Sequence, residues 1–341
     1  MTERTLKPRG SEFDSGTTNK KKATKKVGKY TIDVGVTGIL KDRNIGVPED
    51  YHCKCEYCSK NYLGEIYDTD AGTYYSQAGR RRYYNPKAGT HIAPGHFLGY
   101  RWAIQKFTQS GELVFDPTIG TGTAIIEAIN NGRNGAGIEL EFPDITQSNI
   151  DFQFLRENDK PTGKYTFING NAKDLTTLLP SNGIMHDSIS LVINGTPYPT
   201  LGSVSSDAPE RKNLKKNDAT GKIDIVNNTT FDYANDDNFG KKKGTEYWNF
   251  ITNMYLDCIP FMKKGAKMVI LIKDMMQNKS AYLLHKMVID DILANTTELK
   301  YHGIYMHKHI PPTLFMSTYP KTYPEAGQIP LYQTGIVLTR V

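Results

Sequence analysis

Short apolar runs alternate with stretches of helical periodicity from about residue 91 onward, and this alternation constrains the fold more than any other feature. Six runs are expected to be strands, at residues 113–115, 135–138, 165–168, 189–193, 267–272 and 335–338. Three stretches are expected to be helices, at 123–130, 245–262 and 281–293. The second has an apolar stripe that we interpret as core: Tyr247, Ile251, Met254, Cys258 and Met262. The alternation predicts a doubly wound α/β domain with a mostly parallel sheet over residues 91–341.

Composition is that of an ordinary globular protein, with 341 residues of which 38% are hydrophobic and 23% charged. No run approaches the roughly 20 apolar residues that a membrane helix needs, and the first ten residues lack the apolar stretch of a signal peptide. Three of the four cysteines crowd between positions 53 and 58, which is unlike a disulfide framework. We therefore expect a cytoplasmic protein.

Charge and composition divide the rest of the chain. Residues 1–30 are rich in lysine and poor in aliphatic residues, which predicts a disordered basic arm. Residues 31–90 form a small irregular N-terminal region, and residues 203–243 are a polar, lysine-rich insertion in the α/β domain. The net charge of +6 fits a polyanionic partner but is shared by many other proteins. For the arm and for the insertion, a solvated segment and a phosphate-contacting segment both remain open.

A compact cysteine cluster is a candidate metal site. Cys53, Cys55 and Cys58 could hold structural zinc if His52, His91 or the distant Cys258 supplied a fourth ligand. Because no second Cys-x-x-Cys pair exists, unligated thiols are the alternative.

The sharpest chemical signal is a glycine-rich turn that leaves one predicted strand and enters a helix, with the sequence Phe-Asp-Pro-Thr-Ile-Gly-Thr-Gly-Thr over residues 115–123. Gly120 and Gly122 would let backbone amides approach a ligand at the carboxyl end of the strand. The next strand ends at Glu139, where a carboxylate can accept hydrogen bonds from ribose hydroxyls. Together these features favour a nucleoside site over a purely structural turn. Neither the dinucleotide pattern nor a phosphate loop is present.

This turn resembles motif I of the amino-methyltransferases that act on DNA and bind S-adenosylmethionine. Residues 91–97 are similar to the family's motif X, which embraces the methionine part of the cofactor, and residues 169–175 to the stretch whose acid contacts the adenine amino group. The resemblance covers roughly residues 85–341 and implies a class I methyltransferase fold. It implies these cofactor-binding residues: His91, Asp116, Pro117, Thr118, Gly120, Gly122, Thr123, Glu139 and Asn171. Asn171 replaces the family's acid, although an amide oxygen can also accept a hydrogen bond.

The family's catalytic turn, (Ser/Asn/Asp)-Pro-Pro-(Tyr/Phe/Trp), follows its fourth strand. The matching residues here are Asn194, Gly195, Thr196, Pro197 and Tyr198. Tyr198 would stack on a base flipped out of the duplex, while polar groups of the turn orient the amino nitrogen. Gly195 and Thr196 replace the polar residue and the first proline, so the side-chain acceptor moves to Asn194 or Thr196. An active variant, an inactive cofactor-binding relic and a turn without catalytic meaning remain open.

The resemblance implies methyl transfer to an exocyclic amino group of a DNA base, with cytosine N4 favoured over adenine N6. The sequence from 195 to 199 is closer to the Ser-Pro-Pro-Tyr-Pro form of cytosine N4 enzymes than to the adenine forms. Target recognition would come from the insertion 203–243, from the N-terminal region, or from both. Two alternatives stay open: methylation of an RNA base, and a non-catalytic DNA-binding subunit that keeps the cofactor fold. Cytosine C5 chemistry is disfavoured because no cysteine follows a proline in the catalytic turn.

Overall fold

The computed structural model describes residues 24–27, 30–33, 62–67, 95, 97–156, 163–196, 213–216, 223–226, 235, 237–242, 244–277, 280–308 and 332–341. Several predicted site residues lie outside this described part: Cys53, Cys55, Cys58, His91, Pro197 and Tyr198. Most of the predicted arm and insertion also lie outside it. What was expected of these segments stays a prediction.

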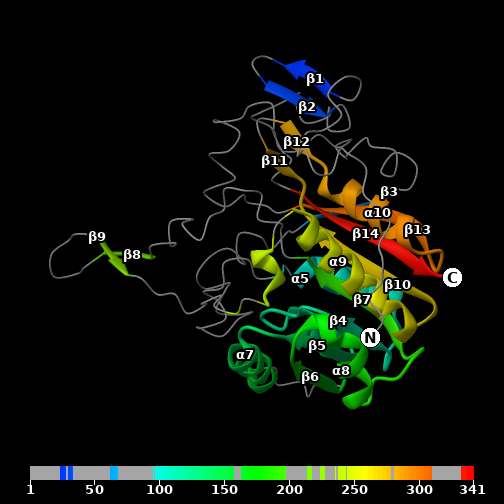
Figure 1. The fold of residues 1–341 in the computed structure, drawn as a ribbon. Coiled ribbons are helices and arrows are strands. Elements are labelled where there is room, and N and C mark those ends of the chain that lie inside the picture. Colours follow the sequence, from blue (N-terminus) through cyan, green and yellow to red (C-terminus); the bar gives the residue numbers. More distant parts are fainter. Residues whose placement is uncertain are drawn as a thin grey trace.

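An eight-stranded sheet in the order β3-β13-β14-β10-β7-β4-β5-β6 forms the centre of the molecule (Figure 1). Its strands are β3 (Tyr62–Tyr67), β4 (Leu113–Asp116), β5 (Asn134–Glu139), β6 (Tyr165–Asn169), β7 (Ile189–Gly195), β10 (Met262–Ile272), β13 (Leu299–Lys308) and β14 (Tyr332–Arg340). The strands from β6 to β10 pair in parallel, and β14 is antiparallel to both of its neighbours. This mostly parallel sheet confirms the predicted α/β fold.

Within the described ranges, three two-stranded pairs accompany the main sheet. They are β1 (Thr24–Val27) with β2 (Tyr30–Asp33), β8 (Asn213–Lys216) with β9 (Ile223–Val226), and β11 (Met275–Gln277) with β12 (Ser280–Tyr282). In addition, β3 pairs in parallel with β13 at the edge of the main sheet, although sequence analysis had found only irregular structure there. The proposed division of the chain into arm, N-terminal region and insertion remains a prediction.

Helices cover both faces of the sheet. The helices fall into two groups according to the buried apolar cluster they join. The first cluster includes residues of α5 (Phe97–Phe107), α6 (Thr123–Asn130) and α7 (Pro143–Arg156). The second includes residues of α8 (Leu175–Ser181), α9 (Gly244–Cys258) and α10 (Leu284–Asn295). Side chains alternate along β7, so that Leu191 and Ile193 join the first cluster and Val192 joins the second. The sheet is therefore doubly wound, as predicted. Among the described helices, none has the length and hydropathy needed to cross a lipid bilayer.

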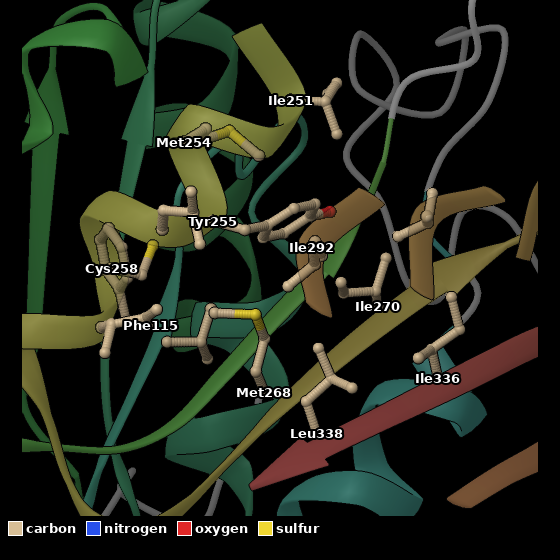
Figure 2. Packing of buried hydrophobic residues seen from close by; sticks show 14 of the residues in the cluster. Phe115, Ile251, Met254, Tyr255, Cys258, Met268, Ile270, Ile292, Ile336 and Leu338 are labelled. Carbon is tan, nitrogen blue, oxygen red and sulfur yellow. The ribbon is translucent and has the colours of Figure 1, made fainter. Parts of the chain in front are cut away.

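The predicted helix 245–262 is confirmed as α9, but it ends four residues early, at Cys258. Pro260 has no backbone N–H to continue the ladder, and a 3₁₀ turn, η5 (Ile259–Phe261), leads directly into β10 at Met262. The expected apolar stripe is buried, with Tyr247 and Cys258 fully covered. Figure 2 shows Ile251, Met254 and Cys258 of α9 among side chains of the second cluster. These residues serve the core, as the periodicity predicted.

The predicted helix 281–293 is shifted, because α10 begins at Leu284. Residues 281 and 282 of the predicted helix belong instead to strand β12, which pairs with β11. Helical periodicity carries no information on such a strand pair. Sequence analysis did not identify α7, α8 or β13. These elements include polar or short segments whose apolar pattern is weak.

Close packing of β13 against β14 generates a stability prediction. A Cβ atom at Gly335 would lie 2.2 Å from Cε1 of the fully buried Tyr305, which pairs with Gly335 across the two strands. Gly335→Ala should therefore lower the free energy of unfolding by about 1–3 kcal/mol, because the ring must move within a packed core. Urea unfolding measures this change. Lys300→Ala, at an exposed position of β13, is the control, and it should change the free energy of unfolding by less than about 0.5 kcal/mol. Equal effects of the two changes would contradict the packing described.

Candidate functional site

Four neighbouring parallel strands present polar residues at one edge of the sheet. β4 ends at Asp116, β5 at Glu139, β6 at Asn169 and β7 at Gly195. Ligands of doubly wound sheets bind outside the carboxyl ends of the strands. The structure brings these predicted site residues to this edge: Asp116, Pro117, Thr118, Gly120, Gly122, Thr123, Glu139, Asn171, Asn194, Gly195 and Thr196.

The turn between β4 and α6 depends on its glycines. Gly120 and Gly122 have φ angles of 55° and 91°, in the left-handed region that favours glycine. A Cβ atom at Gly120 would meet no atom of the described residues within 4 Å, so these residues leave the backbone open on that side. Under the turn, a Cβ atom at Gly137 of β5 would lie 2.5 Å from Cδ1 of Ile119. The turn therefore rests directly on the neighbouring strand and leaves its outer side accessible.

Glu139 holds this turn through backbone amides. Its Oε2 accepts a hydrogen bond from the Gly120 N–H at 3.0 Å, and its Oε1 accepts from Glu141 at 2.8 Å and Phe142 at 3.1 Å. Burial raises the pKa of the Glu139 carboxyl, although these three amides favour its charged form. Oε1 is thus fully used, whereas Oε2 keeps room for one further donor. The ribose contact expected of Glu139 stays a prediction, and Oε2 is the atom available for it.

Two side chains of α7 complete the support of the turn. Thr146 donates to the Gly120 carbonyl at 2.5 Å, and the Asn149 amide donates to the Thr121 carbonyl at 2.6 Å. Both side chains are completely buried. Sequence analysis missed them, because a threonine and an asparagine on a weakly amphipathic helix have no local feature that marks this contact.

Asp116 is a buried carboxyl group with one engaged and one unpaired oxygen. Oδ1 accepts hydrogen bonds from the Thr118 N–H at 3.0 Å and from the Asn194 amide at 2.7 Å. Oδ2 is buried and has no partner among the described residues. Burial raises the pKa of Asp116 to about 7 from an ordinary value of 3.8, despite the opposing effect of the two donors. The group can therefore exchange a proton near neutral pH, and its free oxygen could receive a ligand's cationic donor.

Asn194 links the glycine turn to the predicted catalytic turn. Its amide nitrogen donates both hydrogens, to Asp116 and to the Thr118 hydroxyl at 2.6 Å, while its oxygen accepts from the Tyr255 hydroxyl at 2.8 Å. Tyr255 also hydrogen bonds to the Thr196 hydroxyl. Because Tyr255 has one proton and gives it to Asn194, Thr196 must be the donor in that pair. Sequence analysis did not identify Tyr255, a fully buried residue of α9, as part of the site.

This network bears on the two acceptors expected in the catalytic turn. Asn194 is completely buried and donates both of its amide hydrogens within the protein. Its role is therefore to connect β7 to β4 and the turn that follows β4. Thr196 is also buried and its hydroxyl donates to Tyr255, but its oxygen can still accept a hydrogen bond. Of the two, Thr196 has the more available oxygen.

Asn171 offers a donor rather than the expected acceptor. Its side-chain oxygen accepts from the Lys173 N–H at 3.0 Å, at the start of the 3₁₀ turn η3 (Ala172–Asp174). Its amide nitrogen is buried and has no partner among the residues that the structure describes. An adenine contact through this residue would therefore suit a ring nitrogen, which accepts, better than the amino group.

Lys273 lies two residues beyond Leu271, which pairs with Gly195 across β10 and β7. Burial lowers the pKa of its ammonium group to about 8 from an ordinary value of 10.5. The carboxyl edge thus holds a cation that loses its charge more easily than a surface lysine. The apolar pattern predicted a strand ending at residue 272 and gave Lys273 no role.

No group of three potential metal ligands occurs within the described ranges. Cys258, one of the suggested fourth ligands, is fully buried in the second apolar cluster, and burial raises the pKa of its thiol. A core position of this kind does not suit a zinc ligand, because the thiolate form is disfavoured there. The cluster at Cys53, Cys55 and Cys58 lies outside the described residues.

No protein-family model and no curated protein matches the chain. Solved structures do. They include a candidate transferase, PH0793, from Pyrococcus horikoshii, with 11% identity over 71% of this chain and a TM-score of 0.36. SMU.776, a candidate methyltransferase complexed with SAH, has 7% identity over 71% of this chain and a TM-score of 0.40. M. jannaschii TYW2 in complex with AdoMet has 11% identity over 74% of this chain and 80% of its own, with a TM-score of 0.37.

The chain spans 62% of the length of the Pyrococcus horikoshii protein and 48% of SMU.776. Likeness at these identities and TM-scores does not extend to substrate or activity.

The raised pKa of Asp116 predicts a pH-dependent stability difference. Between pH 4 and pH 7 the unfolded chain loses the Asp116 proton while the folded chain keeps it, so the folded protein should lose stability as pH rises and level off above pH 7. Asp116→Asn preserves an acceptor for Asn194 and Thr118 but cannot ionise. The free energy of unfolding of this variant, minus that of the unsubstituted protein, should increase as pH rises from 4 to 7. The increase should be at most on the order of 4 kcal/mol. Urea unfolding at pH 5 and pH 8 tests this, and a constant difference would contradict the burial of the carboxyl.

Proposed function

We propose that this chain is an S-adenosylmethionine-dependent methyltransferase that modifies an exocyclic amino group of a DNA base. One observation carries the proposal: the Asn194 amide hydrogen bonds to Asp116 and Thr118 and so joins the glycine turn directly to the strand that leads into the Gly-Thr-Pro-Tyr turn. A cofactor turn and a substrate turn that share one buried hydrogen-bond network would be held in a constant relative position. Methyl transfer depends on such positioning, because the amine must attack in line.

The residues at the carboxyl edge fit the parts of S-adenosylmethionine. The free Asp116 Oδ2 suits the methionine ammonium, Glu139 Oε2 suits a ribose hydroxyl, and the free Asn171 nitrogen suits a ring nitrogen of adenine. Gly120 leaves the backbone open for close approach. The cofactor would supply the activated methyl group. This chain's residues would bind it and hold its methyl toward the catalytic turn.

On the substrate side, we propose that Tyr198 stacks on the flipped base and that oxygens of the turn accept hydrogen bonds from its amino group. The Thr196 oxygen keeps acceptor capacity, which supports an active variant over an inactive relic. The lysines of the insertion and the net charge of +6 support a nucleic acid partner. Cytosine N4 is favoured over adenine N6 on the form of the turn, and an RNA base is the alternative substrate.

The first test is transfer of labelled methyl to mixed-sequence duplex DNA, followed by nucleoside mass spectrometry. We expect methylated cytosine N4 or adenine N6. Tyr198→Ala should lower the rate about 10- to 100-fold, because stacking of a base on an aromatic ring contributes about 1–3 kcal/mol. Tyr198→Phe is the matched control, since it keeps the ring and should retain most of the activity.

Other outcomes decide between the alternatives. Transfer to RNA but not to DNA would replace the proposed substrate. Cofactor binding with no transfer to either nucleic acid would favour a non-catalytic subunit.

Asp116 also predicts how cofactor affinity depends on pH. Pairing of its carboxylate with an ammonium requires Asp116 to be ionised, so below pH 7 binding must release its proton. The affinity for S-adenosylhomocysteine should rise up to about tenfold per pH unit from pH 5.5 and level off near pH 7. Titration calorimetry measures this. Asp116→Asn should bind more weakly and lack the rise, and an unchanged pH profile in this variant would contradict the assignment.

A further inference from the structure

Position 195 carries the most informative departure from the family's catalytic turn, because glycine replaces the polar first residue. The backbone does not demand glycine here, since Gly195 is not among the glycines with positive φ in the described part of the chain. It is the last residue of β7 and pairs with Leu271 of β10 in the parallel ladder. The reason for glycine must therefore be the space beside it.

That space is taken by Tyr100 of α5. A Cβ atom at Gly195 would lie 2.8 Å from the Tyr100 hydroxyl oxygen, and the next atom, Cζ, would be 3.9 Å away. The hydroxyl end of the same ring also lies against Gly95, where a Cβ atom would be 2.8 Å from Cε2 and 3.1 Å from the hydroxyl oxygen. Two glycines a hundred residues apart thus make room for one buried tyrosine. Any side chain at position 195 would have to displace the hydroxyl or the strand end.

Alternation along β7 separates this hydroxyl from the network described above. Ile193 lies in the cluster of α5 and α6, and Gly195 faces Tyr100 on that same side. Asn194 contacts Tyr255 of α9 on the opposite side. Among described atoms outside the two flanking residues, the Tyr100 hydroxyl oxygen is the nearest to a Cβ atom at Gly195.

We propose that the Tyr100 hydroxyl takes the place of the polar side chain missing at Gly195 and accepts a hydrogen bond from the amino group of the target base. This rests on the proposed methyl transfer. An aspartate or asparagine oxygen stands two bonds from its Cβ, and the Tyr100 oxygen lies at a similar distance from the same point. The structure thus offers a polar atom from α5 beside the position where the family's turn offers one from β7.

The hydroxyl acts by orienting the nitrogen. When it accepts one N–H, the lone pair of the amino group points away from the base plane toward the methyl carbon. The nitrogen–carbon bond then forms as the carbon–sulfur bond breaks, the electron pair of that bond stays on sulfur, and the surplus proton on nitrogen passes to water. Tyr100 stays protonated throughout.

A swap experiment tests this assignment. Tyr100→Phe removes only the hydroxyl, and kcat for methyl transfer should fall about 10- to 100-fold while the KM for S-adenosylmethionine stays within about twofold. Tyr100→Phe with Gly195→Ser returns the polar atom to its family position, in space that the lost hydroxyl vacates, and should recover most of kcat. The matched control, Tyr100→Phe with Gly195→Ala, fills the same space without an oxygen and should not recover it.

Stability gives a second readout that does not need activity. Gly195→Ala alone should lower the urea midpoint, and adding Tyr100→Phe should restore it, because the nearest of the described atoms outside the flanking residues would then be 3.9 Å from the new Cβ. Additive effects of the two changes would overturn the contact itself. An unchanged kcat in Tyr100→Phe, or equal recovery with serine and alanine, would overturn the role of the hydroxyl and leave the proposed function standing.

A failure of the proposed function can be distinguished from a failure of the role of Tyr100. If the unsubstituted protein methylates RNA but not DNA, the proposed DNA substrate is wrong. The same variants, assayed on RNA, then test the role of Tyr100. If it methylates neither, both the function and this role are overturned.

Discussion

The hydrogen bond from the Asn194 amide to the Asp116 carboxyl is the interaction on which the arrangement of the site depends. It joins the carboxyl ends of β4 and β7 across 78 residues of sequence, inside a region from which water is excluded. A buried carboxyl group is costly unless it is hydrogen bonded or protonated, and Asp116 has two donors and a pKa near 7. The same asparagine also holds Thr118 and Tyr255. A change at this one bond would disturb both turns together.

Support for the site comes from elements that are distant in sequence. The glycine turn after β4 is held by Glu139 at the end of β5 and by Thr146 and Asn149 of α7. The end of β7 is held by Tyr255 of α9 on one side and bounded by Tyr100 of α5 on the other. The sheet positions the turns, and the helices on its two faces fix the atoms within them. At the same edge, the buried atoms Asp116 Oδ2 and Asn171 Nδ2 have no hydrogen-bond partner among the described residues.

Much of the fold could be predicted because it depends on local pattern. All six expected strands are present, and the helix at Thr123–Asn130 has the expected bounds, since apolar periodicity reports which side of an element is buried. The misses have physical causes. The helix ending at Cys258 is cut short by Pro260, and residues 281 and 282 are taken by a strand pair whose partner lies elsewhere in the chain. Elements with weak apolar patterns, such as α7, escaped prediction.

The sequence by itself determined that a glycine turn follows one strand, that an acid ends the next, and that a Gly-Thr-Pro-Tyr turn follows the strand beginning at Ile189. These are local features, because turn geometry and strand burial depend on a few neighbouring residues. Only the tertiary structure decided which polar atoms are consumed and which stay free. In the folded chain Glu139 accepts from backbone amides, the Asn171 oxygen accepts from the Lys173 N–H, and the Tyr100 hydroxyl lies against Gly195. Such pairings depend on how helices pack on the sheet, and residues a hundred positions apart carry no local sign of them.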